Sequence, residues 1–204
     1  IEGRPVGIVA NNPAHLGGAI DTPSADKMAR FMQLCDAFDI PLVSLCDTPG
    51  FMVGPQAEES AQVRHFSRLF VTAASVTIPW ITVVLRKGYG LGAQAMAGGS
   101  FHAKDVIVAW PTGEFGGMGL EGAVRLGFKK ELDAAGTPEM RQELEDRLIA
   151  AAYIRGSALS MASHTEIDDV IDPAETRARI LSIIGRGTSW RQRTGKKRPM
   201  VDTW

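Results

Sequence analysis

A glycine-rich segment after an apolar run is the part of the sequence best suited to chemistry. Residues 80–85 (WITVVL) are typical of a buried strand, and RKGYGLGAQ, residues 86–94, follows them directly. A strand that breaks at glycines and continues as a helix presents unpaired backbone N–H groups, and glycine lets a ligand approach the main chain. Such donors can stabilise a developing oxyanion by roughly 3–4 kcal/mol each. An ordinary glycine-rich turn is the alternative interpretation.

A second glycine motif, GMGLEG, begins at Gly117 and has the G-x-G-x-x-G spacing of dinucleotide-binding proteins. Its context differs from theirs, because PTGEF separates it from the preceding apolar run. No strand that ends in an acid follows at the offset that ribose recognition requires. We therefore favour the start of a helix packed beneath a ligand, and nucleotide binding is the weaker alternative.

The segment DTPGF, residues 47–51, follows another apolar run and predicts a sharp turn. Pro49 fixes one φ angle and Gly50 frees the next, so the chain is expected to turn at the mouth of a pocket. Asp47 would either cap the local backbone or act as an acid–base group.

Neither of two other candidate side chains predicts a catalytic site. A structural role is favoured for His65, and His164 lies near three acids in what reads as a surface loop before a helix. The spacing around His164 fits no closed zinc pattern, so no metal site is expected. The sequence shows no catalytic triad, P-loop or pair of carboxylates, which leaves backbone donors at glycine turns as the candidate chemistry.

The elements that must position these turns alternate along the chain. Short runs rich in Val, Ile and Leu predict strands that are covered on both faces, and apolar stripes at helical spacing separate them. Repeated strand–helix units predict an α/β domain with a mainly parallel sheet and a helical C-terminal segment. The predicted strands are residues 5–10, 40–46, 81–85 and 106–110; the predicted helices are 24–38 with Ser24 as N-cap, 62–74, an amphipathic 138–156 capped at Thr137, and 172–184 with Pro173 in its first turn.

Composition excludes several classes of protein. The chain has 204 residues, 45% of them hydrophobic, and a net charge of −1, which suits one globular domain and not a basic nucleic-acid binder. No apolar run reaches the ~20 residues that cross a bilayer. Buried, reduced thiols are expected for Cys35 and Cys46, so we expect a cytoplasmic protein. The first strand-like run comes almost at once, as in one half of a larger protein.

The end of the chain is basic. We expect a folded domain over residues 1–184 and a tail over 185–204, in which residues 186–198 hold six Lys and Arg residues and no acid. A solvated tail is the default interpretation, and a contact with phosphates or an acidic partner surface is the alternative.

Several motifs together resemble the biotin-dependent carboxyltransferases, which are the β subunits or domains of propionyl-, acetyl- and longer-chain acyl-CoA carboxylases. The resemblance covers nearly the whole chain in order and matches the C-terminal half of a two-part enzyme, each half of which has a crotonase (ClpP-like) fold. The motifs are GRPVGIVANNP at 3–13, SADK at 24–27, CDAF at 35–38, DTPGF at 47–51, LRKGYG at 85–90, AWPTGE at 109–114, IDDVIDP at 167–173 and TR at 176–177.

The resemblance implies a site built from the main chain. In the family, the N-terminal half supplies most of the acyl-CoA site, and the C-terminal half supplies an oxyanion pair that polarises the ureido carbonyl of carboxybiotin. That pair falls on the backbone N–H groups of Leu91 and Gly92, where the family usually has Gly-Gly-Ala in place of Gly90-Leu91-Gly92. Gln94 matches the position that influences which acyl chain fits. The remaining expected substrate- and biotin-binding residues are Gly50, Phe51, Tyr89, Gly90 and Gly117.

The activity implied is transfer of CO2 from carboxybiotin to the α-carbon of an acyl-CoA. The backbone donors would favour loss of CO2, the biotin ring nitrogen would take the α-proton, and the acyl-CoA enolate would capture CO2. The chain has no biotinyl-lysine motif and no ATP-binding loop. The resemblance therefore implies an N-terminal carboxyltransferase half, a biotin carboxyl carrier and a biotin carboxylase as partners, in a dimeric or hexameric assembly.

Three other functions stay open at this point. A biotin-dependent decarboxylase or transcarboxylase would share this fold and pocket. A crotonase-like CoA hydratase or thioesterase would need an acidic side chain near the oxyanion hole, and the Gly90 turn has none next to it in sequence. A non-catalytic assembly module is the third.

Overall fold

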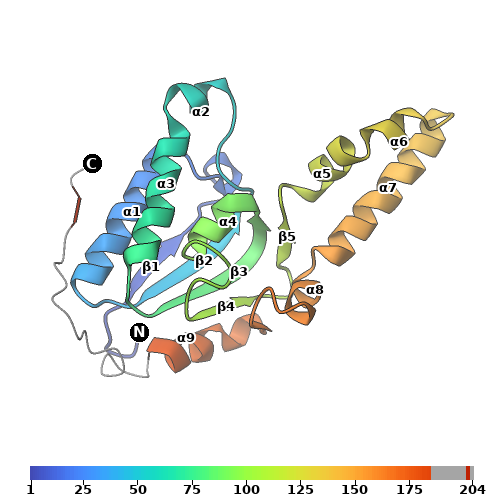
Figure 1. Ribbon diagram of the computed structural model, residues 1–204. Helices are drawn as coiled ribbons and strands as arrows, with labels where there is room; N and C mark the ends of the chain where they lie inside the picture. Colours follow the sequence, from blue (N-terminus) through green and yellow to red (C-terminus); the bar gives the residue numbers. More distant parts are fainter. Residues whose placement is uncertain (185–200, 203–204) are drawn as a thin grey trace.

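A twisted parallel sheet with helices on both faces forms the domain (Figure 1). The computed structural model describes residues 1–184 and 201–202. Within them, the strand order is β1-β2-β3-β4-β6, and β5 pairs in parallel with the end of β3. The predicted α/β architecture with a mainly parallel sheet is confirmed. The strands are β1 Gly7–Ala10, β2 Leu42–Thr48, β3 Trp80–Tyr89, β4 Val106–Ala109, β5 Glu114–Gly116 and β6 Asp169–Val170.

Helices occupy most of the remaining described chain. Two of them, α1 and α3, pack side by side over one face of the sheet, and α9 covers the other face (Figure 1). The helices are η1 Leu16–Gly18, α1 Thr22–Ala37, α2 Pro55–Glu59, α3 Gln62–Ser75, α4 Gly90–Met96, α5 Leu120–Gly127, α6 Lys129–Asp133, α7 Pro138–Arg155, α8 Ala158–Ser163, η2 Pro173–Glu175 and α9 Thr176–Ile184.

The strand that leads to the glycine-rich segment is longer than predicted. β3 runs to Tyr89, so the break lies at Gly90 and not at residue 86. Its early part pairs with β2 and β4, and its last three residues pair with β5, while Gly88 also pairs with Thr48 of β2. Because β5 supplies these later ladder bonds, the polar residues of RKGY stay extended despite their low apolar content.

The predicted N-cap of the first long helix, α1, is wrong, whereas that of α7 is confirmed. The N-cap of α1 is Asp21, not Ser24: the Asp21 side chain accepts a hydrogen bond from the backbone N–H of Ser24 at 3.0 Å. Pro23 suits the first turn of this helix, which moves the start toward the N-terminus. Thr137 does cap α7, accepting from the N–H of Met140 at 3.2 Å.

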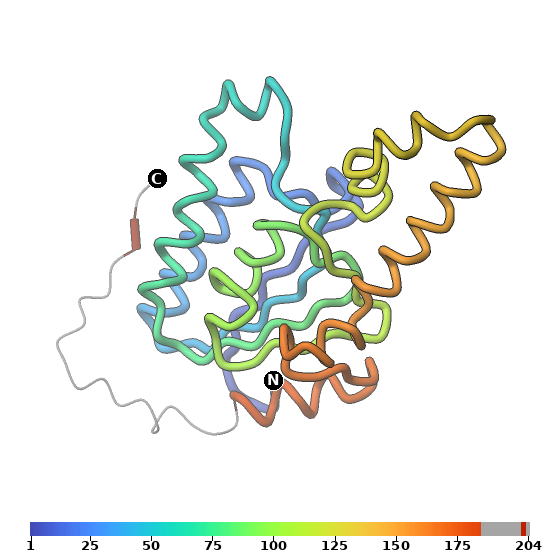
Figure 2. Tube along the Cα trace, turned by 45° about the vertical axis from the view of Figure 1, so that its right-hand side comes forward, coloured from blue at the N-terminus to red at the C-terminus, as the bar shows by residue number. Residues whose placement is uncertain are grey.

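The predicted amphipathic pattern of α7 is also wrong. Within α7, Glu145 is the buried side chain, and it pairs with Arg125 of α5 at 2.7 Å. Figures 1 and 2 show why: α5, α6 and α7 project from the sheet as an arm, so α7 has no sheet to cover. We call residues 120–155 the helical arm.

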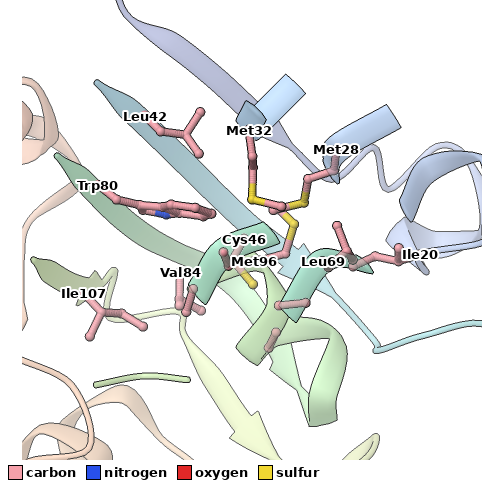
Figure 3. Close-up of a cluster of buried hydrophobic side chains, with 14 of the residues drawn as sticks. Ile20, Met28, Met32, Leu42, Cys46, Leu69, Trp80, Val84, Met96 and Ile107 are labelled. Atoms are coloured by element: carbon pink, nitrogen blue, oxygen red, sulfur yellow. The ribbon is translucent and has the colours of Figure 1, made fainter. Parts of the chain in front are cut away.

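The core has two layers, one on each face of the sheet. Figure 3 shows the larger layer, where side chains of α1, α3 and α4 meet β2, β3 and β4. Trp80 lies fully buried there, and its indole N–H donates to Thr82 Oγ1 at 3.1 Å. The smaller layer joins the opposite face of β2, β3 and β4 to the isoleucines of α9: Ile180, Ile183 and Ile184.

The described end of the chain lies against α1. Gln33 donates to the carboxylate of Asp202 at 2.6 Å, and the N–H of Asp202 donates to Gln33 Oε1 at 2.8 Å. The predicted basic tail, including its alternative phosphate contact, otherwise lies outside the described residues. In the part of the chain that is described, no helix combines the length and the apolar character needed to span a bilayer.

A matched pair of methionines tests the larger core layer. Met32 of α1 is fully buried, whereas Met140 of α7 is 57% exposed. Met32→Ala should lower the free energy of unfolding by about 2–5 kcal/mol, because it leaves a cavity. Met140→Ala should stay within about 0.5 kcal/mol. Urea unfolding followed by circular dichroism measures both, and equal effects would show that this layer is not the stabilising core.

Candidate active site

The turn between β3 and α4 is built on a glycine in the left-handed region. Gly90 has φ +60°, and a Cβ atom there would lie 2.8 Å from the carbonyl oxygen of Gly117. Other residues would therefore be strained and obstructed at this position. The first N–H groups of a helix have no intrahelical acceptor. Leu91 and Gly92, which follow Gly90 in the first turn of α4, therefore present backbone donors at this point.

A second close approach fixes the other side of the turn. Gly92 lies outside the left-handed region, but a Cβ atom there would lie 2.7 Å from the carbonyl carbon of Gly50 and 2.9 Å from the nitrogen of Phe51. The turn after β2, the β3–α4 turn and the residue after β5 therefore meet at one place. The structure brings together most of the predicted site, namely Gly50, Phe51, Tyr89, Gly90, Leu91, Gly92 and Gly117.

Two polar residues that sequence reasoning missed hold the Gly50 turn. Thr48 Oγ1 lies 3.1 Å from both the nitrogen and the carbonyl oxygen of Gly50. The buried amide of Gln62, on α3, donates to the carbonyl of Met52 at 2.8 Å and to that of Ile20 at 3.3 Å. A polar side chain at the start of an apolar helix stripe was the available signal for Gln62.

The side chains of the site point in different directions. The ring of Phe51 stacks on Phe66 with centroids 3.6 Å apart, so a ligand would meet the backbone of Phe51 and not its ring. The Leu91 side chain is 60% exposed, and Gln94 is half-buried on α4. The turn therefore opens to the surface at Leu91.

Asp47, at the end of β2, binds the backbone of Lys87 and the side chain of Arg86 on β3, and so it is not free for proton transfer. Its Oδ1 accepts from the N–H of Lys87 at 3.2 Å, and its Oδ2 pairs with Arg86 Nη2 at 3.2 Å. These contacts span a shift in the β2–β3 register that lies between Cys46 and Thr48. Of the two interpretations of Asp47, the capping one agrees with this geometry.

A buried tyrosine lies at the end of β3. The hydroxyl of Tyr89 donates to Glu114 Oε2 at 2.6 Å, and the tyrosine is only 4% exposed. Burial raises the pKa of Tyr89 far above its usual value, and the Glu114 carboxylate raises it further. Tyr89 is therefore a neutral hydrogen-bond donor throughout the working range of pH.

The histidines take part in local contacts. Asp26 of α1 accepts from His65 at 2.7 Å and from Arg68 at 2.5 Å, which ties α1 to α3. Nδ1 of His164 lies 2.8 Å from the carbonyl of Ser160. Among the described residues, no three His, Cys, Asp or Glu side chains are placed to hold a metal ion.

A large groove lies elsewhere, between β1, η1 and α1. Its volume is about 890 Å³, and Ile8, Phe31 and Leu34 are among its lining residues. None of the predicted site residues lines it. This groove therefore lies away from the candidate turn, at which Leu91 is exposed while Gly50 and Gly92 are buried.

A comparison with known families identifies the family of this chain. The model of the Carboxyl transferase domain matches residues 1–198, and the chain belongs to this family. It is 41% identical to the methylmalonyl-CoA carboxyltransferase 12S subunit of Propionibacterium freudenreichii subsp. shermanii, over 97% of this chain and 37% of that protein. It is 40% identical to the biotin-dependent acetyl-/propionyl-CoA carboxylase β6 subunit of Mycobacterium bovis, over 95% of this chain and 41% of that protein.

Solved structures show the same fold. A single-chain, multi-domain long-chain acyl-CoA carboxylase is 58% identical, with a TM-score of 0.79, over 90% of this chain and 18% of that one. The transcarboxylase 12S hexamer with methylmalonyl-CoA and methylmalonic acid bound is 38% identical, with a TM-score of 0.84, over 97% of this chain and 38% of that one. The chain spans less than half the length of each of these proteins.

The close approach at Gly92 gives a stability prediction. Gly92→Ala should lower the free energy of unfolding by about 1–3 kcal/mol, because the new methyl group meets backbone atoms that cannot move independently. Gly127→Ala is the matched control, since nothing lies within 4 Å of its Cβ position and its φ is outside the left-handed region. Thermal or urea unfolding of both variants checks this, and an unaffected Gly92→Ala would mean that the two turns are not in contact.

Proposed function

We propose that this chain supplies the biotin-side half of a carboxyltransferase site, which moves CO2 from carboxybiotin to the α-carbon of an acyl-CoA. The observation that supports this most directly is the β3–α4 turn, where Gly90 and Gly92 pack closely against neighbouring backbone and α4 begins with N–H groups that have no intrahelical acceptor. Family membership supplies the reaction class. Leu91 and Gly92 are the proposed donors.

The residues of the turn suit a biotin ureido group. That group offers a carbonyl oxygen as an acceptor, and two adjacent N–H groups are suitable donors for an oxygen that gains negative charge. Gly90 and Gly117 have no side chains, so their backbones lie close together and a ligand could contact the main chain of both. When bound, carboxybiotin supplies the CO2 and, through its ring nitrogen, the base for the α-proton.

The protein's own part is then to orient and to stabilise charge. Both oxygens of Asp47 are engaged by Lys87 and Arg86, and the Tyr89 hydroxyl donates its hydrogen bond to Glu114. Neither side chain is available as a base at this turn. This agrees with a reaction in which the chain contributes backbone dipoles that are in place before charge develops.

An exposed turn needs a second surface to exclude water. We propose that the N-terminal carboxyltransferase half covers Leu91 and brings the acyl-CoA, as the family resemblance implies. The biotin carboxyl carrier and the biotin carboxylase would be separate domains or subunits, and the assembly would be oligomeric. A hexamer is described for the transcarboxylase 12S relative.

We further propose that the protein works in the cytoplasm. Cys35 and Cys46 are both free and buried, and burial raises the pKa of the Cys35 thiol to about 11. Protonated, buried thiols suit a reducing compartment.

Transcarboxylation is the second candidate, because the transcarboxylase 12S structure is 38% identical to this chain. The carboxylase direction is preferred because the long-chain acyl-CoA carboxylase structure is 58% identical. Supplying the full-length protein and its partners with ATP, bicarbonate and an acyl-CoA, and then with a carboxylated acyl-CoA as the only CO2 donor, distinguishes the two.

The donor role of the turn is testable at Leu91, whose side chain is exposed. Leu91→Pro removes one N–H at a helix position that tolerates proline, and kcat for carboxyl transfer should fall by about 10²–10³. Leu91→Ala keeps the donor and should stay within a few-fold of the wild-type protein. The assay uses the full-length protein with its carrier and measures carboxylated acyl-CoA.

Thermal stability and oligomer size of the Leu91 variants are the controls, since proline can also distort the turn. A correctly assembled Leu91→Pro enzyme with near-normal kcat would place the oxyanion site elsewhere.

Gln94 carries the prediction on acyl specificity. It lies on α4 beyond Gly92 and is half-buried. Gln94→Asp places a charge there and should change the ratio of kcat/KM between acetyl-CoA and a long-chain acyl-CoA about tenfold, the size of a modest pocket effect. Competition between the two substrates measures the ratio directly. An unchanged ratio in an intact assembly would contradict a role for Gln94.

A further inference from the structure

The hydrogen bond between Tyr89 and Glu114 connects the candidate site to the base of the helical arm. We propose that this bond positions the backbone donors of the β3–α4 turn, which makes Tyr89 and Glu114 positioning residues for carboxyl transfer. The inference rests on the proposed function, because the donors it positions are those assigned to the biotin carbonyl.

The first support is that β5 lies beside β3 immediately before the turn and flanks it opposite β2, which reaches this end of β3 through the pair Thr48–Gly88. The last three residues of β3 pair with β5 in the register Lys87–Glu114, Gly88–Phe115 and Tyr89–Gly116. One residue further on, Gly90 comes within close range of the carbonyl of Gly117. β5 and the end of β2 therefore hold the turn from two sides, and a shift of β5 would move the donors.

The second support is that β5 is fixed from its other side. The N–H of Phe115 donates to the carbonyl of Gly156 at 2.7 Å, and the N–H of Ala158 donates to that of Gly113 at 2.9 Å. A Cβ atom on Gly156 would lie 2.4 Å from the carbonyl oxygen of Phe115, so the contact is tight. Glu114 thus starts from a backbone that is held at the α7–α8 junction, and Figure 1 shows β5 between the sheet and the arm.

The third support is the chemistry of the pair. The Tyr89 hydroxyl lies 2.6 Å from Glu114 Oε2, and hydrogen bonds to a carboxylate are shorter and stronger than neutral ones. Besides Glu114 on β5, the groups that act on Tyr89 are Tyr153 of α7 and Glu121 of α5, and with burial they keep its pKa high. Tyr89 therefore keeps its proton and donates a hydrogen bond to Glu114, which suits positioning and not acid–base catalysis.

The test uses the full-length, assembled enzyme and measures kcat and KM for the acyl-CoA together. Tyr89→Phe and Glu114→Leu should each lower kcat by roughly 10- to 100-fold, the effect of misplacing a donor by a fraction of an ångström to 1 Å. KM for the acyl-CoA should change little, because the other half binds it. Glu114→Gln keeps an acceptor oxygen and should restore most of the activity.

Three further measurements separate positioning from other roles. Tyr153→Phe removes the same hydroxyl from the neighbouring α7 tyrosine and should leave kcat near that of the wild-type enzyme. The Tyr89→Phe/Glu114→Leu double variant should be no worse than either single variant, because both remove one interaction. The pH profile of Tyr89→Phe should keep its shape and lose only height.

Each contrary result overturns the proposal. A folded Tyr89→Phe enzyme with normal kcat removes the positioning role, and the loss of one limb of the pH profile would make Tyr89 an acid–base residue instead. Additive losses in the double variant would show that the two side chains act separately. An inactive wild-type enzyme would refute the proposed function itself, which keeps the two failures distinct.

Discussion

The structure depends on the parallel pairing of β3. This strand pairs with β2 and β4 along its first part and with β5 and the last residue of β2 at its end, and its residues from Trp80 to Val84 are buried. A parallel strand covered on both faces needs neighbours that satisfy its backbone groups. β2 and β4 place the strand in the core, and β5 carries it outward to Gly90. The helix that follows can therefore begin only where the ladder with β5 stops.

Close packing of backbone against backbone then shapes the site. At Gly90 and Gly92 the neighbouring main chain lies where a side chain would be, and the partners are the backbone atoms of Gly117 and Gly50. A site made this way uses dipoles that need no reorganisation when charge develops. Such a site also tolerates different side chains at Leu91, because every residue except proline has the backbone N–H group. The resemblance to the carboxyltransferases implies glycine as the usual residue at this position.

Local sequence was informative where one strand or helix face determines the outcome. The apolar runs predicted four strands, Thr137 was predicted as a helix cap, and the glycines of residues 86–94 predicted the turn, all of which the structure contains. The parts that were missed depend on distant partners: β5 has three residues and β6 has two, too few for a periodic pattern. Gln62 and Glu114 were not identified because their roles come from carbonyl and hydroxyl groups that the chain brings near only on folding. The amphipathic prediction for α7 was wrong because the helix leaves the sheet.

The helical arm differs from the rest of the domain in how firmly its backbone is protected. Within α7 only Glu145 is buried, whereas β3 lies between strands and beneath helices. Local unfolding takes less free energy where few apolar contacts must be broken. We therefore expect amide hydrogens of the arm to exchange with solvent through local opening of the arm, and those of β3 to exchange only when the sheet separates. Fast and slow exchange should consequently meet near Gly156, where the arm is joined to β5.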